Sequence, residues 1–119
     1  MSDAAKHLEA IDGAALEKRA AAKGIAIPNA LSIFNARMVA EELHETQFTL
    51  IPSMIAPSVE EGVGISFMNN EKRAIIECYN TGQILLGLSN ARAMEVLPIN
   101  SDKKEIHGAL ARVYEFLNS

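Results

Sequence analysis

The chain has no tryptophan, one cysteine, four prolines and no long apolar run. With the single cysteine, Cys78, no disulfide can form within the chain, and this usage is typical of a reducing compartment. The N-terminus lacks the apolar segment of a signal peptide, and no apolar run approaches the about 18 residues that a membrane span needs. These absences predict a cytoplasmic protein that does not bind a membrane.

Positive charge and aromatic rings are also scarce. The 11 Lys and Arg residues are outnumbered by 15 Asp and Glu residues, which gives a net charge of −4. The most basic stretch, "EKRAAAK" at residues 17–23, holds only three cations. Four Phe and two Tyr are too few for the base-stacking surfaces of single-strand-binding proteins. We therefore expect no nucleic-acid partner.

The amino acids that are present are typical of one globular domain spanning residues 1–119. Apolar residues make up 49% of the chain and charged residues 22%. A chain of 119 residues buries roughly two-thirds of its unfolded surface, so the fold needs neither a structural metal nor a disulfide. No cofactor or metal is expected.

Residues 1–46 are predicted to be helical. The first 23 residues are rich in Ala, Glu and Lys, but Gly13 leaves open whether they form one helix or two short ones. Gly24 is placed to end that segment. Asn29 is a good N-cap for the next helix, which has the clearest helical pattern in the chain.

In that next helix, Leu31, Phe34, Met38 and Glu42 lie on one line, with Ile33, Ala36, Val39 and Leu43 beside it. The apolar members make a wide stripe that we expect to face the core. Polar residues that fall largely outside the stripe are Ser32, Asn35, Arg37 and Glu41.

Residues 63–99 contain four runs of strand length joined by short turns, which predicts a four-stranded antiparallel meander. In the turn "NTG", Gly82 is expected in the left-handed conformation. Residues 47–62 carry prolines and are expected to be an extended connection, of which a part could be an edge strand. A last helix is predicted over residues 101–118, with Asn100, Ser101 or Asp102 as its cap. The fold class is therefore α+β, with the C-terminal helix packed on one sheet face.

Alternation along the strands assigns side chains to two faces of this sheet. The face expected under the helices is almost entirely apolar: Val63, Ile65, Phe67, Ala74, Ile76, Cys78, Ile84, Leu86, Leu88, Met94 and Val96. The opposite face is mixed: Gly64, Ser66, Met68, Ile75, Glu77, Tyr79, Leu85, Gly87, Ser89, Glu95 and Leu97. Cys78 and Glu77 thus point in opposite directions, so we expect Cys78 to be an unreactive core residue rather than part of a catalytic pair.

Motifs for metal or nucleotide chemistry are incomplete. Glu41 and His44 form one Glu-x-x-His, but a di-metal site needs this motif twice with further carboxylates. "GVGISF" at residues 62–67 lacks the third glycine of a dinucleotide fingerprint, and its glycines enter a strand instead of opening a helix. We interpret the first as a solvated helix face and the second as a turn.

The runs "PSVEEGVGISF" and "AIIECYNTGQIL" resemble a loosely defined group of small uncharacterised bacterial proteins. In that group a Pro-rich segment and a Gly-marked turn precede a strand that ends in an aromatic residue, and an "Ile-Glu" strand and a "Gly-Glu/Gln-Ile" strand follow. The likeness covers about residues 51–90. It implies the central hairpins, and it implies no particular activity.

Two functions are compatible with these features. The first is a non-catalytic interaction protein, self-associating as a homodimer or acting on a protein partner like an antitoxin or inhibitor, through a sheet edge or the mixed face. Its interaction residues would be Met68, Ile75, Glu77, Tyr79, Leu85 and Leu97. The second is a small-molecule-binding protein or enzyme with Glu77 and Tyr79 in a pocket for which Gly64 and Gly87 leave room. Either function requires that this face is open, so neither residues 1–23 nor residues 47–58 would cover it.

Overall fold

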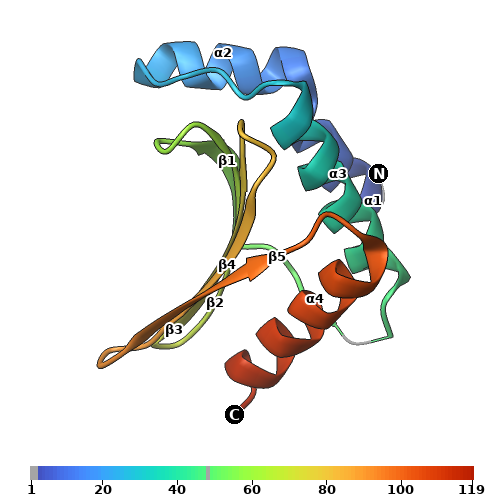
Figure 1. The fold of residues 1–119 in the computed structure, drawn as a ribbon, viewed down its shortest axis with the longest axis vertical. Helices are drawn as coiled ribbons and strands as arrows, with labels where there is room; N and C mark the ends of the chain where they lie inside the picture. The colour runs from blue at the N-terminus through green and yellow to red at the C-terminus, as the bar shows by residue number, and fades with distance from the viewer. Residues whose placement is uncertain (1–2, 48) are drawn as a thin grey trace.

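The computed structural model describes residues 3–47 and 49–119, and it shows an α+β fold built from helices and one antiparallel sheet (Figure 1). The helices are α1 (Asp3–Ala10), α2 (Gly13–Lys23), α3 (Ala30–Glu45) and α4 (Lys103–Leu117). The strands are β1 (Met54–Ser58), β2 (Gly62–Asn69), β3 (Lys72–Tyr79), β4 (Ile84–Ser89) and β5 (Met94–Ile99).

The helix ends follow the residues that favour them. The N-terminal segment is two helices, because Asp12 caps α2 by accepting a hydrogen bond from the backbone N–H of Ala15. Gly24 ends α2 in the left-handed conformation, with φ 66°, as predicted. Asn29 caps α3 as predicted, and Asp102 is the residue that caps α4.

The five strands pair in chain order, each antiparallel to the next, so that the sheet is a meander of four hairpins. Gly82 has φ 93° in the turn between β3 and β4, which confirms its predicted conformation. Asn70 has φ 57° in the turn between β2 and β3, a conformation that asparagine tolerates better than most residues.

The prediction of four strands is wrong by one strand. The segment assigned to a connection at residues 47–62 contains β1, which lies at the edge of the sheet and pairs with β2. Pro57 lies within β1, and proline is tolerated there because an edge strand has one side without hydrogen-bonding partners. The alternative prediction, that part of residues 47–62 forms an edge strand, is therefore confirmed.

The helices lie on one side of the sheet. α1, α3 and α4 cover one face, and α2 lies across one end and packs on β1 (Figure 1). The core between these layers buries Val63, Ile65, Phe67, Ala74, Ile76, Cys78, Ile84, Leu86 and Leu88, as the alternation predicts. From the helices, Leu16, Val39, Ile106, Leu110 and Val113 complete it.

The predicted stripe of α3 faces the core only in part. Ala36, Val39 and Leu43 are buried as predicted, whereas Leu31 and Phe34 are 54% and 62% exposed, and Ser32 and Asn35 are buried in their place. The polar residues are turned inward because they have partners there: the Ser32 hydroxyl donates to Asn80 Oδ1 at 2.7 Å, and the Asn35 amide donates to the backbone oxygen of Gly82 at 3.2 Å. These bonds tie the start of α3 to the β3–β4 turn.

Candidate functional site

The sheet surface that faces away from α1, α3 and α4 is here called the outer face. The strand register places Met68, Ile75, Glu77, Tyr79 and Leu85 on it, as predicted. The large apolar side chains of the outer face are Met54, Met68, Ile75, Leu85, Met94 and Val96.

The predicted position of Leu97 is wrong. Leu97 pairs with the core residue Leu86 and packs against the core on the helix-covered side. The turn between β4 and β5 fixes this register, because it pairs Ser89 with Met94 and so puts Met94 on the outer face. Val96 follows Met94 onto the outer face, and Glu95 turns to the helical side, where it forms an ion pair with Arg112 of α4 at 2.6 Å.

Within the described residues, no helix covers the outer face. Met94 is 72% exposed, Met54 is 58% exposed, and Met68 and Val96 are each 51% exposed. Residues 1–23 and 47–58 were the two candidates for a cover. The helices α1 and α2 of the first candidate pack on α3 and at the β1 edge, and Met54–Ser58 of the second candidate is the strand β1 of the sheet. The outer face therefore presents apolar side chains to solvent.

Ile75 occupies the centre of the outer face. A Cβ added at Gly87 would lie 3.2 Å from its Cγ2, and one added at Gly64 would lie 3.4 Å from its Cδ1. The two glycines on the flanking strands thus make room for the Ile75 side chain. Ile75 thus occupies part of the space that the sequence assigned to a ligand, and Gly87 also lines the groove described next.

One end of the outer face is an apolar groove of about 370 Å³. Met54, Met68, Met94 and Ile75 line it, and Arg73 from β3 brings a positive charge to it. Methionine side chains are flexible and polarisable, so a surface built from them adapts to the shape of what it contacts.

The other end of the outer face is polar and acidic. Ser58 of β1 donates a hydrogen bond to Glu77 Oε2 at 2.8 Å, which ties the carboxylate to the neighbouring hairpin. The Tyr79 hydroxyl donates to Glu60 Oε2 at 3.1 Å. The carboxylates of Glu77 and Glu60 therefore each accept a hydrogen bond from a neighbouring hydroxyl.

Tyr79 is not suited to act as a base. Burial raises its pKa to about 12, and the nearby carboxylates of Glu77 and Glu60 add to the rise. A hollow of about 320 Å³ lies beside Tyr79 and Leu85, but Glu77 does not line it. Glu77 thus lies close to Tyr79 but outside the lining of this hollow.

Both open edges of the sheet carry a proline whose nitrogen faces outward. In an antiparallel ladder, hydrogen-bonded and non-bonded pairs alternate. The backbone bond from Asn90 to Ala93 sets this alternation for β5, and it leaves Pro98 in a non-bonded pair with Leu85. On β1, the backbone bond from Asn80 to Glu61 implies that Val63 forms its backbone hydrogen bonds with β3. Pro57, which lies opposite Val63, is therefore also in a non-bonded pair. Prolines at these positions remove donors from both edges, which disfavours strand addition.

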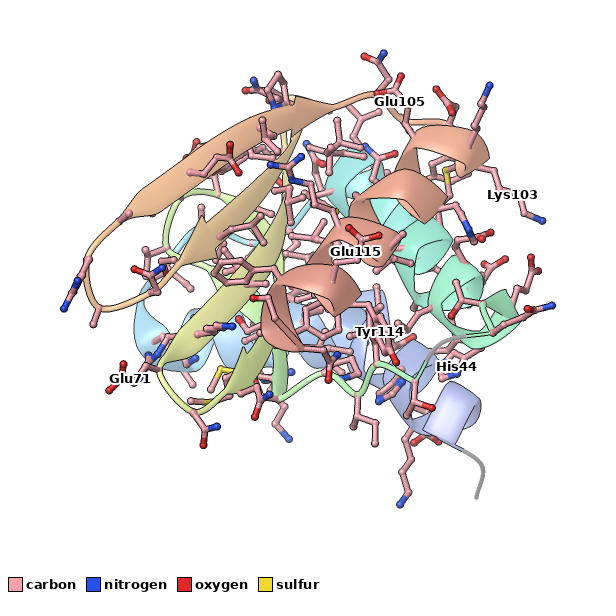
Figure 2. All side chains as sticks on the ribbon, turned by 90° about the horizontal axis from the view of Figure 1, so that it is seen from below. His44, Glu71, Lys103, Glu105, Tyr114 and Glu115 are labelled. Atoms are coloured by element: carbon pink, nitrogen blue, oxygen red, sulfur yellow. The ribbon has the colours of Figure 1, made fainter. Side chains whose placement is uncertain are left out.

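A cluster of charges lies on the helical side, between α3 and α4. Glu42 is buried, and its Oε2 is 2.8 Å from His107 Nδ1. Lys103 Nζ lies 2.7 Å from Glu45 and 3.9 Å from Glu42, and Figure 2 shows Lys103 in the first turn of α4. We interpret this cluster as a structural link between the two helices, since it compensates the buried carboxylate.

His44 of the Glu41-x-x-His44 motif contacts another histidine. Its Nε2 lies 2.9 Å from His7 Nδ1 of α1, and the two rings stack. In the part of the chain that the structure describes, no group of three or more His, Cys, Asp or Glu residues is arranged to hold a metal ion.

Four residues of the outer face were not predicted from the sequence. Met54 was assigned to the connection, Met94 and Val96 were assigned to the core, and Arg73 was given no role. A signal for Met94 was present, because a two-residue loop between Asn90 and Ala93 places Ser89 and Met94 on the same face.

Within residues 3–47 and 49–119, no helix is long and apolar enough to cross a membrane. The geometry leaves the outer face as an apolar surface that no helix of the described residues covers. Comparison of the chain with protein-family models, with curated proteins and with solved structures gives no match.

Proposed function

We propose that this protein is a non-catalytic interaction module that binds a protein partner through the outer face. The observation that carries the proposal is the exposure of Met54, Met68, Met94 and Val96 around Ile75 on a sheet whose other face packs against the helices. Contiguous apolar surface of this kind is typical of protein contacts. The outward-facing nitrogens of Pro57 and Pro98 favour this face over the sheet edges as the contact surface.

The test places one charge on the outer face and one elsewhere. Met94→Asp and Phe34→Asp are a matched pair, because both residues are exposed and apolar, while Phe34 lies on α3 on the helical side. We expect Met94→Asp to lose a partner that the wild type and Phe34→Asp both retain in affinity purification from the native cells. An unpaired charge costs several kcal/mol inside an interface and little at a solvated site.

Circular dichroism melts of the three proteins are the control for folding, and we expect equal midpoints. Retention of the same partner by Met94→Asp would show that the outer face is not the contact surface. A lower midpoint for Met94→Asp would show that the face is part of the fold.

A second candidate function is the binding of a small molecule on the same face. The groove beside Met68 and Met94, at about 370 Å³, has the size of a ligand pocket, and Arg73 offers a charge for an anionic group. The hollow beside Tyr79 is the polar alternative, with Glu60 in its lining. Native mass spectrometry of the purified protein separates the two functions, since a retained small molecule adds a defined mass that Met94→Asp should lose.

A further inference from the structure

We propose that the partner of the outer face is a second copy of this chain, packed face to face with its strands antiparallel. The inference rests on the proposed function and adds the identity of the partner and the geometry of the contact. It follows from how charge and side-chain size are distributed along the strands, which the register gives residue by residue.

The charges on β3 are arranged symmetrically about Ile75. Arg73 lies two residues before it and Glu77 two residues after it, and all three point to the outer face. Arg73 has no acidic partner among the described residues. Glu77 is held in place by Ser58 at 2.8 Å. Each copy therefore offers one positive and one negative group at equal spacing from an apolar centre.

Consider a two-fold axis that lies in the plane between two such sheets, runs perpendicular to the strands and passes over Ile75. This axis creates two Arg73–Glu77 pairs between the copies. Arg73 of each copy then faces Glu77 of the other, and Ile75 faces its own equivalent. An axis parallel to the strands would instead place like charges opposite each other, which is unfavourable. The charge pattern thus selects the antiparallel arrangement.

Side-chain size follows the same symmetry. Across the sheet, Met68, Arg73, Ser89 and Met94 form one row of paired positions, and Gly64, Glu77, Leu85 and Pro98 form another. The axis places the first row of one copy over the second row of the other. Met68 then lies over Gly64 and Leu85 over Ser89, so a large side chain meets a small residue on each strand next to β3.

The chain also disfavours other ways of pairing two copies through the sheet. The nitrogens of Pro57 and Pro98 face the two open edges, so edge-to-edge pairing lacks donors at these positions. Face-to-face packing needs no backbone donors. It leaves α1, α3 and α4 on the outside of the pair, where they already shield the core (Figure 1).

The test is a charge exchange, measured by sedimentation velocity and light scattering. We expect a wild-type dimer, and we expect Arg73→Glu and Glu77→Arg each to weaken it roughly tenfold or more, because each places like charges opposite each other. The double variant Arg73→Glu/Glu77→Arg restores the opposite pairs and should regain the dimer. An equimolar mixture of the two single variants should also form a dimer, since every pair in it is complementary.

Lys104→Glu and Glu115→Arg are the matched controls. They make the same changes of net charge on α4, which Figure 2 shows with Glu115 along its length, and we expect both to remain dimeric. Circular dichroism checks that every variant is folded. A double variant and a mixture that both stay monomeric would overturn the antiparallel geometry.

A wild type that is monomeric at all concentrations would overturn the second copy as partner. The proposed function would then still stand if Met94→Asp, and not Phe34→Asp, lost a different partner. Failure of this inference is therefore distinguishable from failure of the proposed function.

Discussion

Cys78 and Glu77 are neighbours in the chain, yet they lie on opposite faces of β3. The thiol is fully buried among core residues, and the carboxylate accepts a hydrogen bond on the outer face. Burial raises the pKa of the Cys78 thiol to about 12, and the negative charge of Glu77 adds to the rise. The protonated thiol is a weak nucleophile, so the residue contributes packing to the fold.

This raised pKa predicts that the protein loses stability at alkaline pH. From the ordinary value of 9.0 up to about 12, the unfolded chain releases the Cys78 proton and the native protein keeps it. The stabilisation is complete below pH 9 and is lost as the pH rises through this range, by up to about 1.4 kcal/mol of unfolding free energy per pH unit. Urea unfolding at a series of pH values measures it.

Cys78→Ala is the comparison for that experiment. The variant is less stable at every pH because it loses a buried sulfur. The comparison is therefore between the slopes of the unfolding free energy with pH, and not between its absolute values. We expect a shallower alkaline slope for the variant. Equal slopes would mean that the native thiol reaches solvent.

Leu97, which was wrongly predicted to lie on the outer face, shows why the sequence assigned most but not all residues to the correct face. In β3, Ile76 and Cys78 alternate with Arg73 and Glu77, so the polar residues mark the outer face. In β5, apolar residues occupy both faces, and alternation alone does not choose between them. The choice is made by Asn90, whose side chain accepts hydrogen bonds from the backbone N–H groups of Arg92 and Ala93 and fixes the turn.

At the scale of elements, the junction between α3 and the β3–β4 turn depends on a pair of asparagines. The Asn29 backbone N–H donates to Asn80 Oδ1, and the Asn29 amide donates to the Asn80 backbone oxygen, each at 2.9 Å. Asn29 Oδ1 also caps α3 by accepting from the Ser32 backbone N–H at 3.1 Å. One side chain thus both starts the helix and fixes it to the sheet.

Asn29→Ala should therefore cost more than the loss of a helix cap alone. We expect a loss of about 2 kcal/mol in the free energy of unfolding, because the cap bond and the bond to the Asn80 backbone are both removed. Asp12→Ala is the control, since Asp12 caps α2 through a single bond to Ala15, and its loss should cost about 1 kcal/mol. Equal urea midpoints for the two variants would contradict a second role for Asn29.

The sequence predicted the elements better than their orientation. The caps at Asn29 and Gly24 and the turn at Gly82 were predicted because they depend on local backbone chemistry. The burial of Ser32 at the start of α3 was not predicted, because its partner is Asn80, 48 residues further along the chain. The strand β1 was uncertain because Pro57 is acceptable only at an edge, and position within the sheet is a property of the whole fold.

In the whole molecule, the outer face of the sheet is the surface on which no helix packs. The helices need only one face of the sheet to bury their apolar residues (Figure 1). An antiparallel sheet with one solvated face normally carries polar residues there. The outer face instead carries the exposed methionines Met54, Met68 and Met94, and this departure is what a contact with a second copy explains.

The proposed dimer predicts that thermal stability depends on protein concentration. A partner that binds the native chain and not the unfolded one stabilises the native state by mass action, so a tenfold rise in concentration above the dissociation constant should raise Tm by roughly 3 °C. Arg73→Glu should melt at one temperature at every concentration, because it no longer pairs. Lys104→Glu should follow the wild type. Scanning calorimetry over a concentration series gives the result, and a wild-type Tm that does not change would mean that the outer face is not held by a second copy.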